Sequence, residues 1–386
     1  MCGIAGYVGE GNGESLKNMI AAIKYRGPDN TGVFVNGKVG LAHARLSIID
    51  LSPQGNQPMS SGNNSVAIVF NGEIYNFKEL REGLNASGKC TFISASDTEV
   101  ILHLYEEYGE DCFRMLNGMF AIALYDFKED KLILARDRLG KKPLYWSKFN
   151  STIIFASELK AIAKHPSFKK RLNLQALNKY FLYDYVPTPW SIFENVYKLE
   201  PATILTWKEG KVSKRKFWAL QGAENKIGLG QAASELGKEI ERSTKARLIS
   251  DVPLGVFLSG GIDSSTIAYY AQKNSVEKIK TFSMGFGEKS FDESRYARRV
   301  AEFLNTDHYN FMLREADCLK LIPEVLGDMD EPLADASLIP TLLLSRFTKE
   351  HVTVALGGDG GDELFAGYPT FPAHILANFY KRMPRV

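Results

Sequence analysis

Short apolar runs, interrupted by Gly, Asn and Asp, dominate the first half of the chain. The run SVAIVF leads into NGEIYN, and FAIALYDFKEDKLILARD contains two apolar runs around a polar turn, a pattern typical of paired strands. In DTEVILHLYEEYG the apolar positions recur every three or four residues, which predicts a helix. The first half is therefore expected to combine many strands with a few helices.

The pattern changes after about residue 205. The stretch TWKEGKVSKRKFWALQGAENKIGLG is polar with little periodicity, and we interpret it as the end of a strand pair followed by an interdomain linker, 206–228. Beyond it, apolar strands that end in glycine (VPLGVFLSGG, IKTFSMGF and VTVALGGDGG) alternate with helical patterns. This alternation predicts an α/β unit with a parallel sheet covered by helices. The expected domains are residues 2–205 and 229–386.

Composition restricts the class of protein without identifying it. The 386 residues suffice for two domains, and 47 Lys and Arg against 45 Asp and Glu leave a net charge of +2. That charge does not indicate nucleic acid or an anionic membrane as a partner. The four cysteines show no metal-type spacing, and no apolar run approaches the ~20 residues that span a bilayer. A soluble, cytoplasmic protein is expected.

The stretch GVFLSGGIDSSTIAYYAQ is the most specific in the second half. An apolar strand runs into Ser259-Gly260-Gly261, and a helix is expected to begin near Asp263-Ser264. Glycines let the main chain approach an anion, and the start of a helix offers free N–H groups. No GKS or GKT follows, so this is not a Walker A loop. The alternative is a plain strand-to-helix turn, but the stretch resembles the pyrophosphate loop of ATP pyrophosphatases, which cleave ATP to AMP and pyrophosphate.

A second glycine-rich strand end, LGGDGGDELFAGY, carries Asp359, Asp362 and Glu363. A loop at the carboxyl end of a parallel strand lies where α/β sheets bind ligands. Acidic groups beside a phosphate loop suit Mg²⁺, which takes oxygen ligands from carboxylates and phosphates. A solvated acidic turn is the alternative for this loop taken alone.

The N-terminal MCGIAG raises a question about Cys2. Cys2 is either a small apolar residue at the start of a strand or, after removal of Met1, a thiol nucleophile beside its own α-amine as base. Arg45 in an apolar strand, the pair Asn71-Gly72 and the carboxylates of Glu73 and Asp97 suggest what it would attack. The arginine matches an α-carboxylate, the two acids an α-ammonium group, and Asn71-Gly72 an oxyanion hole.

Together these motifs resemble the asparagine synthetase (glutamine-hydrolysing) family over essentially the whole chain. The resemblance implies a class II glutamine amidotransferase domain with an N-terminal-nucleophile αββα sandwich, followed by an ATP-pyrophosphatase synthetase domain. It implies a ligase with ATP and Mg²⁺ as cofactors and with glutamine, ATP and aspartate as small-molecule partners. A homodimer is the assembly that it suggests.

The family also implies a role for each matching residue. Cys2 would attack the glutamine amide, Asn71 and Gly72 would hold the oxyanion, Arg45 the glutamine carboxylate, and Glu73 and Asp97 the α-amino group. ATP would be bound by the loop and strand residues Leu258, Ser259, Gly260, Gly261, Asp263, Ser264, Met284, Gly357 and Gly358. Asp263 and Asp362 would hold Mg²⁺ through pyrophosphate.

Two departures from the family keep alternatives open. Asp359 stands where better-known members carry glutamate in SGEGSDE, and members continue past the point where this chain ends, with a lysine that stabilises adenylation. The chain is therefore expected to be C-terminally truncated, to hydrolyse glutamine and to make little asparagine. The alternatives are a related amidotransferase that aminates another carboxylate, as in cell-surface glycan synthesis, and a truncated glutaminase or regulatory fragment.

Overall fold

The computed structural model describes residues 1–88, 90–222, 227–288 and 292–382. The chain forms two compact units. The first comprises Met1–Asn225 together with Pro323–Ala336, and the second comprises Lys226–Ile322 together with Ser337–Val386. Each unit is described by itself.

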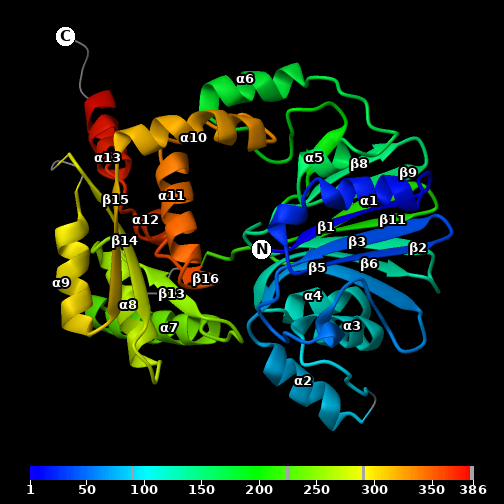
Figure 1. Cartoon of the computed structure of the whole chain (residues 1–386), viewed down its shortest axis with the longest axis horizontal. Helices are drawn as coiled ribbons and strands as arrows, with labels where there is room; N and C mark the ends of the chain where they lie inside the picture. The colour runs from blue at the N-terminus through cyan, green and yellow to red at the C-terminus, as the bar shows by residue number, and fades with distance from the viewer. Residues whose placement is uncertain (89, 223–226, 289–291, 383–386) are drawn as a thin grey trace. The chain divides into compact units, whose positions relative to one another are not determined.

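Two six-stranded antiparallel sheets form the centre of the first unit (Figure 1). The first sheet has the order β10-β8-β9-β1-β3-β2, with strands β1 (Gly3–Val8), β2 (Asn30–Asn36), β3 (Val39–Arg45), β8 (Tyr145–Phe149), β9 (Thr152–Ala156) and β10 (Val196–Lys198). The second has the order β12-β11-β7-β6-β5-β4, with strands β4 (Met59–Ser60), β5 (Val66–Ile74), β6 (Gly118–Asp126), β7 (Lys131–Arg136), β11 (Thr203–Lys208) and β12 (Lys211–Lys216).

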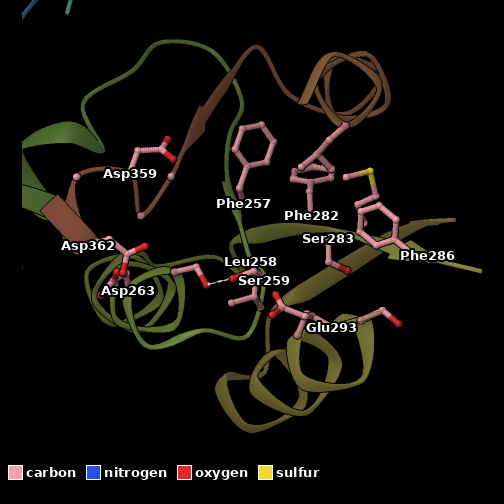
Figure 2. Close-up of a pocket in the computed structure, with 18 of the residues that line it drawn as sticks. Phe257, Leu258, Ser259, Asp263, Phe282, Ser283, Phe286, Glu293, Asp359 and Asp362 are labelled. Carbon is pink, nitrogen blue, oxygen red and sulfur yellow. Dashed lines mark hydrogen bonds between the residues drawn. The ribbon is translucent and has the colours of Figure 1, made fainter. Parts of the chain in front are cut away.

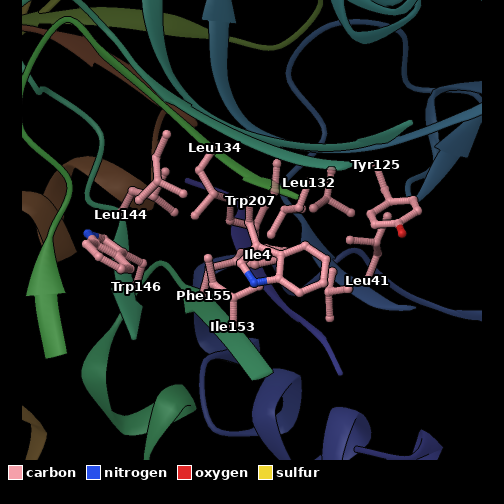
Figure 3. Packing of buried hydrophobic residues seen from close by; sticks show 14 of the residues in the cluster. Ile4, Leu41, Tyr125, Leu132, Leu134, Leu144, Trp146, Ile153, Phe155 and Trp207 are labelled. Carbon is pink, nitrogen blue, oxygen red and sulfur yellow. The ribbon is translucent and has the colours of Figure 1, made fainter. Parts of the chain in front are cut away.

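The two sheets pack face to face through a shared apolar core. Ile4, Leu41 and Phe155 of the first sheet meet Leu134 and Trp207 of the second (Figure 3). Successive side chains of a strand point to opposite faces. Ala5 and Tyr7 of β1 therefore face the other way, into a second core beneath the helices. Because β1 is buried on both faces, it is apolar throughout, as the sequence GIAGYV shows.

Helices cover the outer face of each sheet. The first sheet packs against α1 (Gly13–Ala21), α5 (Leu159–Ile162) and α6 (Leu174–Tyr183). The second is covered by α3 (Asp97–Tyr108), with α2 (Phe77–Ala86) and α4 (Cys112–Met115) beside it (Figure 1). The four layers confirm the αββα sandwich expected of the first half, and α3 coincides with the predicted helix.

Residues 206–216, which the sequence analysis placed in a linker, form part of the second sheet. Strand β12 pairs with β11 from Thr203↔Lys216 to Lys208↔Lys211. The stretch is polar because β12 is an edge strand whose side chains are largely exposed. Its composition therefore resembles that of a linker although its main chain is paired.

The second unit contains a parallel four-stranded sheet with helices on both faces. Its order is β15-β14-β13-β16, with strands β13 (Leu254–Phe257), β14 (Lys280–Phe286), β15 (Asp307–Leu313) and β16 (Val354–Leu356). The helices are α7 (Leu229–Arg247), α8 (Ile262–Lys273), α9 (Ser294–Leu304), α11 (Leu338–Lys349), α12 (Gly361–Phe365) and α13 (Thr370–Lys381). The helix α10 (Glu315–Asp328) begins in this unit, and its residues from Pro323 onward belong to the first. The predicted parallel α/β sheet is confirmed.

The two faces of this sheet are packed differently. Val256 and Leu258 meet Ala268 of α8 and Ala297 of α9 on one face. On the other face Phe282 stacks on the ring of Tyr309 and contacts Phe347 of α11 edge-on. The chain moves from β13 to β14 on one side and later adds β16 on the other side of β13. This reversal creates a crevice at the carboxyl ends of β13 and β16, where sheets of this kind bind ligands.

Within the described part of the chain, no helix combines the length and the apolar character that crossing a membrane would require.

Candidate functional site

Cys2 lies immediately before β1, opposite the end of β3. Its Sγ accepts a hydrogen bond from the main-chain N–H of Leu46 at 3.4 Å, and its thiol donates to the carbonyl of Leu46 at 3.6 Å. The guanidinium Nε of Arg26 donates to the carbonyl oxygen of Cys2 at 3.0 Å. Burial raises the pKa of the Cys2 thiol, so the group is protonated at neutral pH and needs a base before it can act as a nucleophile.

The N-terminal amine of Met1 lies close to Cys2, Arg26 and Lys142, although Met1 as a whole residue is 52% exposed. Burial, as the largest cause, lowers the pKa of this amine from 8.0 to about 6. The Nζ of the buried Lys142 lies 2.6 Å from Sδ of Met1. An amine with a pKa near 6 is largely unprotonated at neutral pH and can accept a proton.

Asn71 and Gly72 occupy the end of β5. Asn71 is 1% exposed, and neither its side-chain oxygen nor its nitrogen has a hydrogen-bond partner among the described residues. A buried amide with neither polar atom bonded is rare in proteins, and this one is free to bond a water or a ligand. Gly72 packs so closely on β6 that an added Cβ would lie 2.1 Å from the carbonyl oxygen of Met119.

The main-chain N–H of Gly72 points away from β6. Its partner across the ladder, Phe120, exchanges both of its main-chain bonds with Asp137, so Gly72 and Phe120 form a non-hydrogen-bonded pair. The N–H groups of Phe70 and Ile74 face the same edge of β5. There they donate to Gln57 Oε1 at 2.6 Å and to Asp97 Oδ2 at 3.0 Å. The Gly72 N–H thus lies between two side-chain acceptors on this edge of β5.

Arg45, at the end of β3, is 5% exposed and is held by the loop that follows it. Its Nη1 donates to the carbonyl of Ser52 and to Oδ1 of Asn56, both at 2.8 Å, and its Nη2 donates to the carbonyl of Asp50. The loop closes tightly, because a Cβ on Gly55 would lie 2.3 Å from Nη2. These contacts fix the guanidinium in one position.

Asp97 begins α3, where Ser96 caps the helix by accepting from the N–H of Glu99. Burial raises the pKa of Asp97 from 3.8 to about 7, and the charge of Glu73 adds to the increase. Two buried carboxylates that repel one another form a site at which a cation would lower both pKa values. An ammonium group has the right charge for this place.

The predicted residues of the first unit are brought together. Asp97 raises and Arg45 lowers the pKa of the Cys2 thiol, and Glu73 raises the pKa of the nearby terminal amine. Interactions of this kind require the groups to be close neighbours. The region therefore combines a thiol, a poised amine, an unpartnered amide, a fixed guanidinium and an acidic pair.

Sequence reasoning missed three residues that support this arrangement. Arg26 was given no role by the sequence analysis, although its side chain donates to the carbonyl of Cys2. The Nε2 of the fully buried His43 lies 3.1 Å from the carbonyl oxygen of Phe70, and Gln57 bonds the N–H of that residue. The available signal for His43 was a polar residue inside an apolar strand two positions before Arg45, whereas nothing in the loop around Gln57 was distinctive.

In the second unit the loop after β13 is shaped by its glycines and serines. Gly260 has φ +86°, and a Cβ there would lie 2.5 Å from the main-chain nitrogen of Ala297. The hydroxyl of Ser259 lies 2.9 Å from that of Ser264 and accepts from the N–H of Gly261 at 3.2 Å. The loop thus delivers the chain to the N-terminus of α8, where free N–H groups favour an anion.

The loop after β16 packs directly on this turn. A Cβ on Gly358 would lie 2.9 Å from the main-chain nitrogen of Ser264, and one on Gly361 would lie 2.3 Å from Oδ2 of Asp263. Figure 2 shows the carboxylates of Asp263 and Asp362 side by side at one end of the pocket, with Asp359 on the same loop. The two acids come from the first turns of α8 and α12.

A pocket of about 400 Å³ opens at these strand ends. Eight of the predicted nucleotide-site and metal-site residues line it: Leu258, Ser259, Asp263, Ser264, Met284, Gly357, Gly358 and Asp362. Gly260 and Gly261 shape the turn but do not line the pocket. Phe257, Ser283, Phe286 and Glu293, which were not predicted, also line it (Figure 2). Its volume is in the range of small-molecule sites.

The pocket suits a divalent ion that is bound together with phosphate. Within the described ranges, no three His, Cys, Asp or Glu side chains form a metal cluster of their own. Mg²⁺ commonly binds through one or two carboxylates and the phosphates of a substrate. The adjacent oxygens of Asp263 and Asp362 fit that kind of site.

Known proteins resemble this chain along its whole length. A family described as glutamine amidotransferase domain matches residues 1–218, and one described as asparagine synthase matches residues 235–385. A Methanocaldococcus jannaschii protein, named as a candidate glutamine-hydrolysing asparagine synthetase 2, is 38% identical over 100% of this chain and 79% of its own length.

Two Bacillus subtilis proteins are also similar. Asparagine synthetase [glutamine-hydrolyzing] 1 is 37% identical over 96% of this chain and 58% of its own length. Asparagine synthetase [glutamine-hydrolyzing] 3 is 33% identical over 96% of this chain and 64% of its own length. The chain thus spans between about three fifths and four fifths of the length of these relatives. By its two domains and their order, it belongs to the glutamine-hydrolysing asparagine synthetase family.

Proposed function

We propose that the first unit hydrolyses glutamine at Cys2 and that the second activates a carboxylate with ATP, which the released ammonia then aminates. The observation that carries the proposal is Asn71, whose buried amide has both polar atoms unpartnered, two positions before Glu73 on β5. Leaving such a group unsatisfied costs free energy, and the amide oxygen of a bound glutamine would supply the missing partner of Nδ2.

In the first chemical step the amine acts as the base and the thiol as the nucleophile. Removal of Met1 would place the free amine on Cys2 itself, in surroundings that already depress an amine pKa. That amine would take the thiol proton, and the thiolate would attack the amide carbon of glutamine. Ammonia then leaves with the proton, and the glutamyl thioester is hydrolysed by water.

The remaining groups of the first unit bind glutamine and stabilise the oxyanion. Asn71 Nδ2 and the outward N–H of Gly72 would donate to the oxygen as it becomes negative, and one such donor contributes ~2.7–4 kcal/mol to the transition state. Arg45 would bind the glutamine carboxylate with charge-assisted hydrogen bonds. Glu73 and Asp97 would hold the α-ammonium group.

In the second unit the pocket would bind ATP, with its phosphates on the turn before α8. Asp263 and Asp362 would hold Mg²⁺, which when bound neutralises charge on the phosphates. The turn carries no Walker lysine, which favours cleavage between the α- and β-phosphates to AMP and pyrophosphate. Aspartate is the proposed acceptor, on the strength of family membership.

The test is glutamate release from glutamine by the full chain, after N-terminal sequencing has shown that Met1 is absent. Cys2→Ala should abolish the reaction, and Asn71→Ala should lower kcat about 10²–10³-fold with little change in KM. Hydrolysis that survives in Cys2→Ala would exclude Cys2 as the nucleophile.

A further inference from the structure

The segment Pro323–Ala336 comes from the second half of the sequence but packs as part of the first unit. Along the chain it continues into the second unit at both ends, through Ile322 and Ser337. The proposed function assigns it no role.

Main-chain hydrogen bonds and the partly buried carboxylate of Glu331 hold this segment on the first unit. The N–H of Ala334 donates to the carbonyl of Asp184 at 2.8 Å. Glu331 uses both of its oxygens, accepting from the main-chain N–H of Ile192 at 2.9 Å and pairing with the Nζ of Lys198 at 2.6 Å. Because the Glu331 carboxylate is bound by two kinds of donor, it fixes both the position and the orientation of the segment.

The neighbouring Asp330 holds Lys160 of α5. Its Oδ2 accepts from the main-chain N–H of Lys160 at 3.2 Å, and its Oδ1 lies 3.7 Å from the lysine Nζ. The same Nζ donates to the carbonyl of Asp328 at 2.8 Å. Two residues of the segment, Asp328 and Asp330, thus hold the side chain of Lys160 in place.

Lys160 is linked to Cys2, the residue before β1, through the side chains of Glu158 and Arg26. Its Nζ lies 3.5 Å from Oε2 of Glu158, whose Oε1 is 2.6 Å from Nη1 of Arg26. Arg26 in turn donates through Nε to the carbonyl of Cys2 at 3.0 Å. Glu158 and Arg26 are both nearly buried, so little solvent separates their charges.

We infer that Asp330 is a positioning residue for Cys2, acting through Lys160, Glu158 and Arg26, and that the segment Pro323–Ala336 is the route by which the second unit influences glutamine hydrolysis. The inference rests on the proposed function of Cys2. Asp330 touches neither the thiol nor the substrate groups Arg45 and Asp97. Loosening Arg26 should therefore displace the nucleophile without removing the contacts that bind glutamine.

The experiment compares kcat and KM for glutamine hydrolysis by the full chain, with Met1 removed, in Asp330→Asn, Lys160→Met and Lys160→Arg. Small displacements of reacting groups lower rates about ten- to hundredfold, so the first two variants should lose kcat to that extent while KM stays within about twofold. Lys160→Arg keeps the charge and should recover most of the loss. Lys208→Met, which removes an exposed ion pair with Glu129 in the same unit, is the control and should match wild type.

A second measurement tests the route. Mg-ATP should change kcat for glutamine in wild type, and this response should be lost in Asp330→Asn. Equal responses in the two proteins would overturn the route, and an unchanged kcat in Asp330→Asn would overturn the positioning role. A wild-type chain with no glutaminase activity would instead refute the proposed function itself.

Discussion

Replacing His43 with leucine tests whether the strand that carries Asn71 and Gly72 must be held from the opposite sheet. His43 is fully buried on β3, and its Nε2 lies 3.1 Å from the carbonyl of Phe70 on β5. A carbonyl can only accept, so Nε2 carries the proton and donates. Burial, the largest cause, lowers the pKa of His43 from 6.5 to about 3, which keeps the ring neutral at assay pH.

The size of the stability loss follows from the Phe70 carbonyl, which loses its hydrogen-bond donor. Leucine leaves the Phe70 carbonyl buried without this donor, which costs ~1–3 kcal/mol of stability. The melting temperature should fall by about 2–4 °C for each kcal/mol in a unit of this size. Because Phe70 directly precedes the oxyanion residues, we expect kcat for glutamine to fall about tenfold, less than the ~10²–10³-fold loss of a whole donor.

The assay is glutamate release together with thermal unfolding, with His43→Gln and His165→Leu as comparisons. Glutamine retains an N–H donor and should restore most of kcat. His165 is buried in the same unit against the ring of Tyr7, so leucine there should change stability and leave kcat unaffected. Wild-type kcat in His43→Leu, or an equal loss of kcat in His165→Leu, would refute the reasoning.

The pH dependence of unfolding gives an independent check. The folded pKa of His43 lies below its unfolded value, so its contribution to stability is complete above pH ~6.5 and is lost as pH falls towards 3. The wild type should therefore lose stability more steeply over this range than His43→Leu. Parallel slopes would show that His43 is not held neutral.

Three further predictions concern the other binding groups. Arg45→Ala should raise KM for glutamine by the equivalent of ~2–5 kcal/mol with a smaller effect on kcat at saturation, and an unchanged KM would place the carboxylate elsewhere. Asp97 has a folded pKa near 7, so stability that it contributes at low pH is lost as pH rises through 7. Bound ammonium should lower that pKa, so KM for glutamine should fall as pH rises to about 7, a trend that Asp97→Asn should lack in steady-state assays. Asp263→Asn should reduce ATP turnover and its Mg²⁺ dependence but not glutaminase activity. Radiolabelled ATP should yield AMP and pyrophosphate in wild type, and formation of ADP and phosphate instead would contradict the proposed cleavage.

Local chemistry made much of this protein predictable from its sequence. The turn at Ser259–Gly261 could be recognised because a strand end, two glycines and a helix start are adjacent along the chain. Short apolar runs bounded by polar turns predicted the strands β5, β6 and β7, and the spacing in DTEVILHLYEEYG predicted α3. These signals depend on contacts between near neighbours, which the order of residues alone determines.

Other features depended on segments that meet only in the folded chain. The polar run 206–216 pairs as an edge hairpin, since pairing uses main-chain groups that side-chain composition does not reveal. The pKa of Asp97 near 7 arises from burial beside Glu73, and the partners of His43 and Asp330 lie on distant elements. Tertiary packing alone placed Pro323–Ala336 in the first unit, because a docking contact depends on the shape and charge of a surface assembled from many parts of the chain.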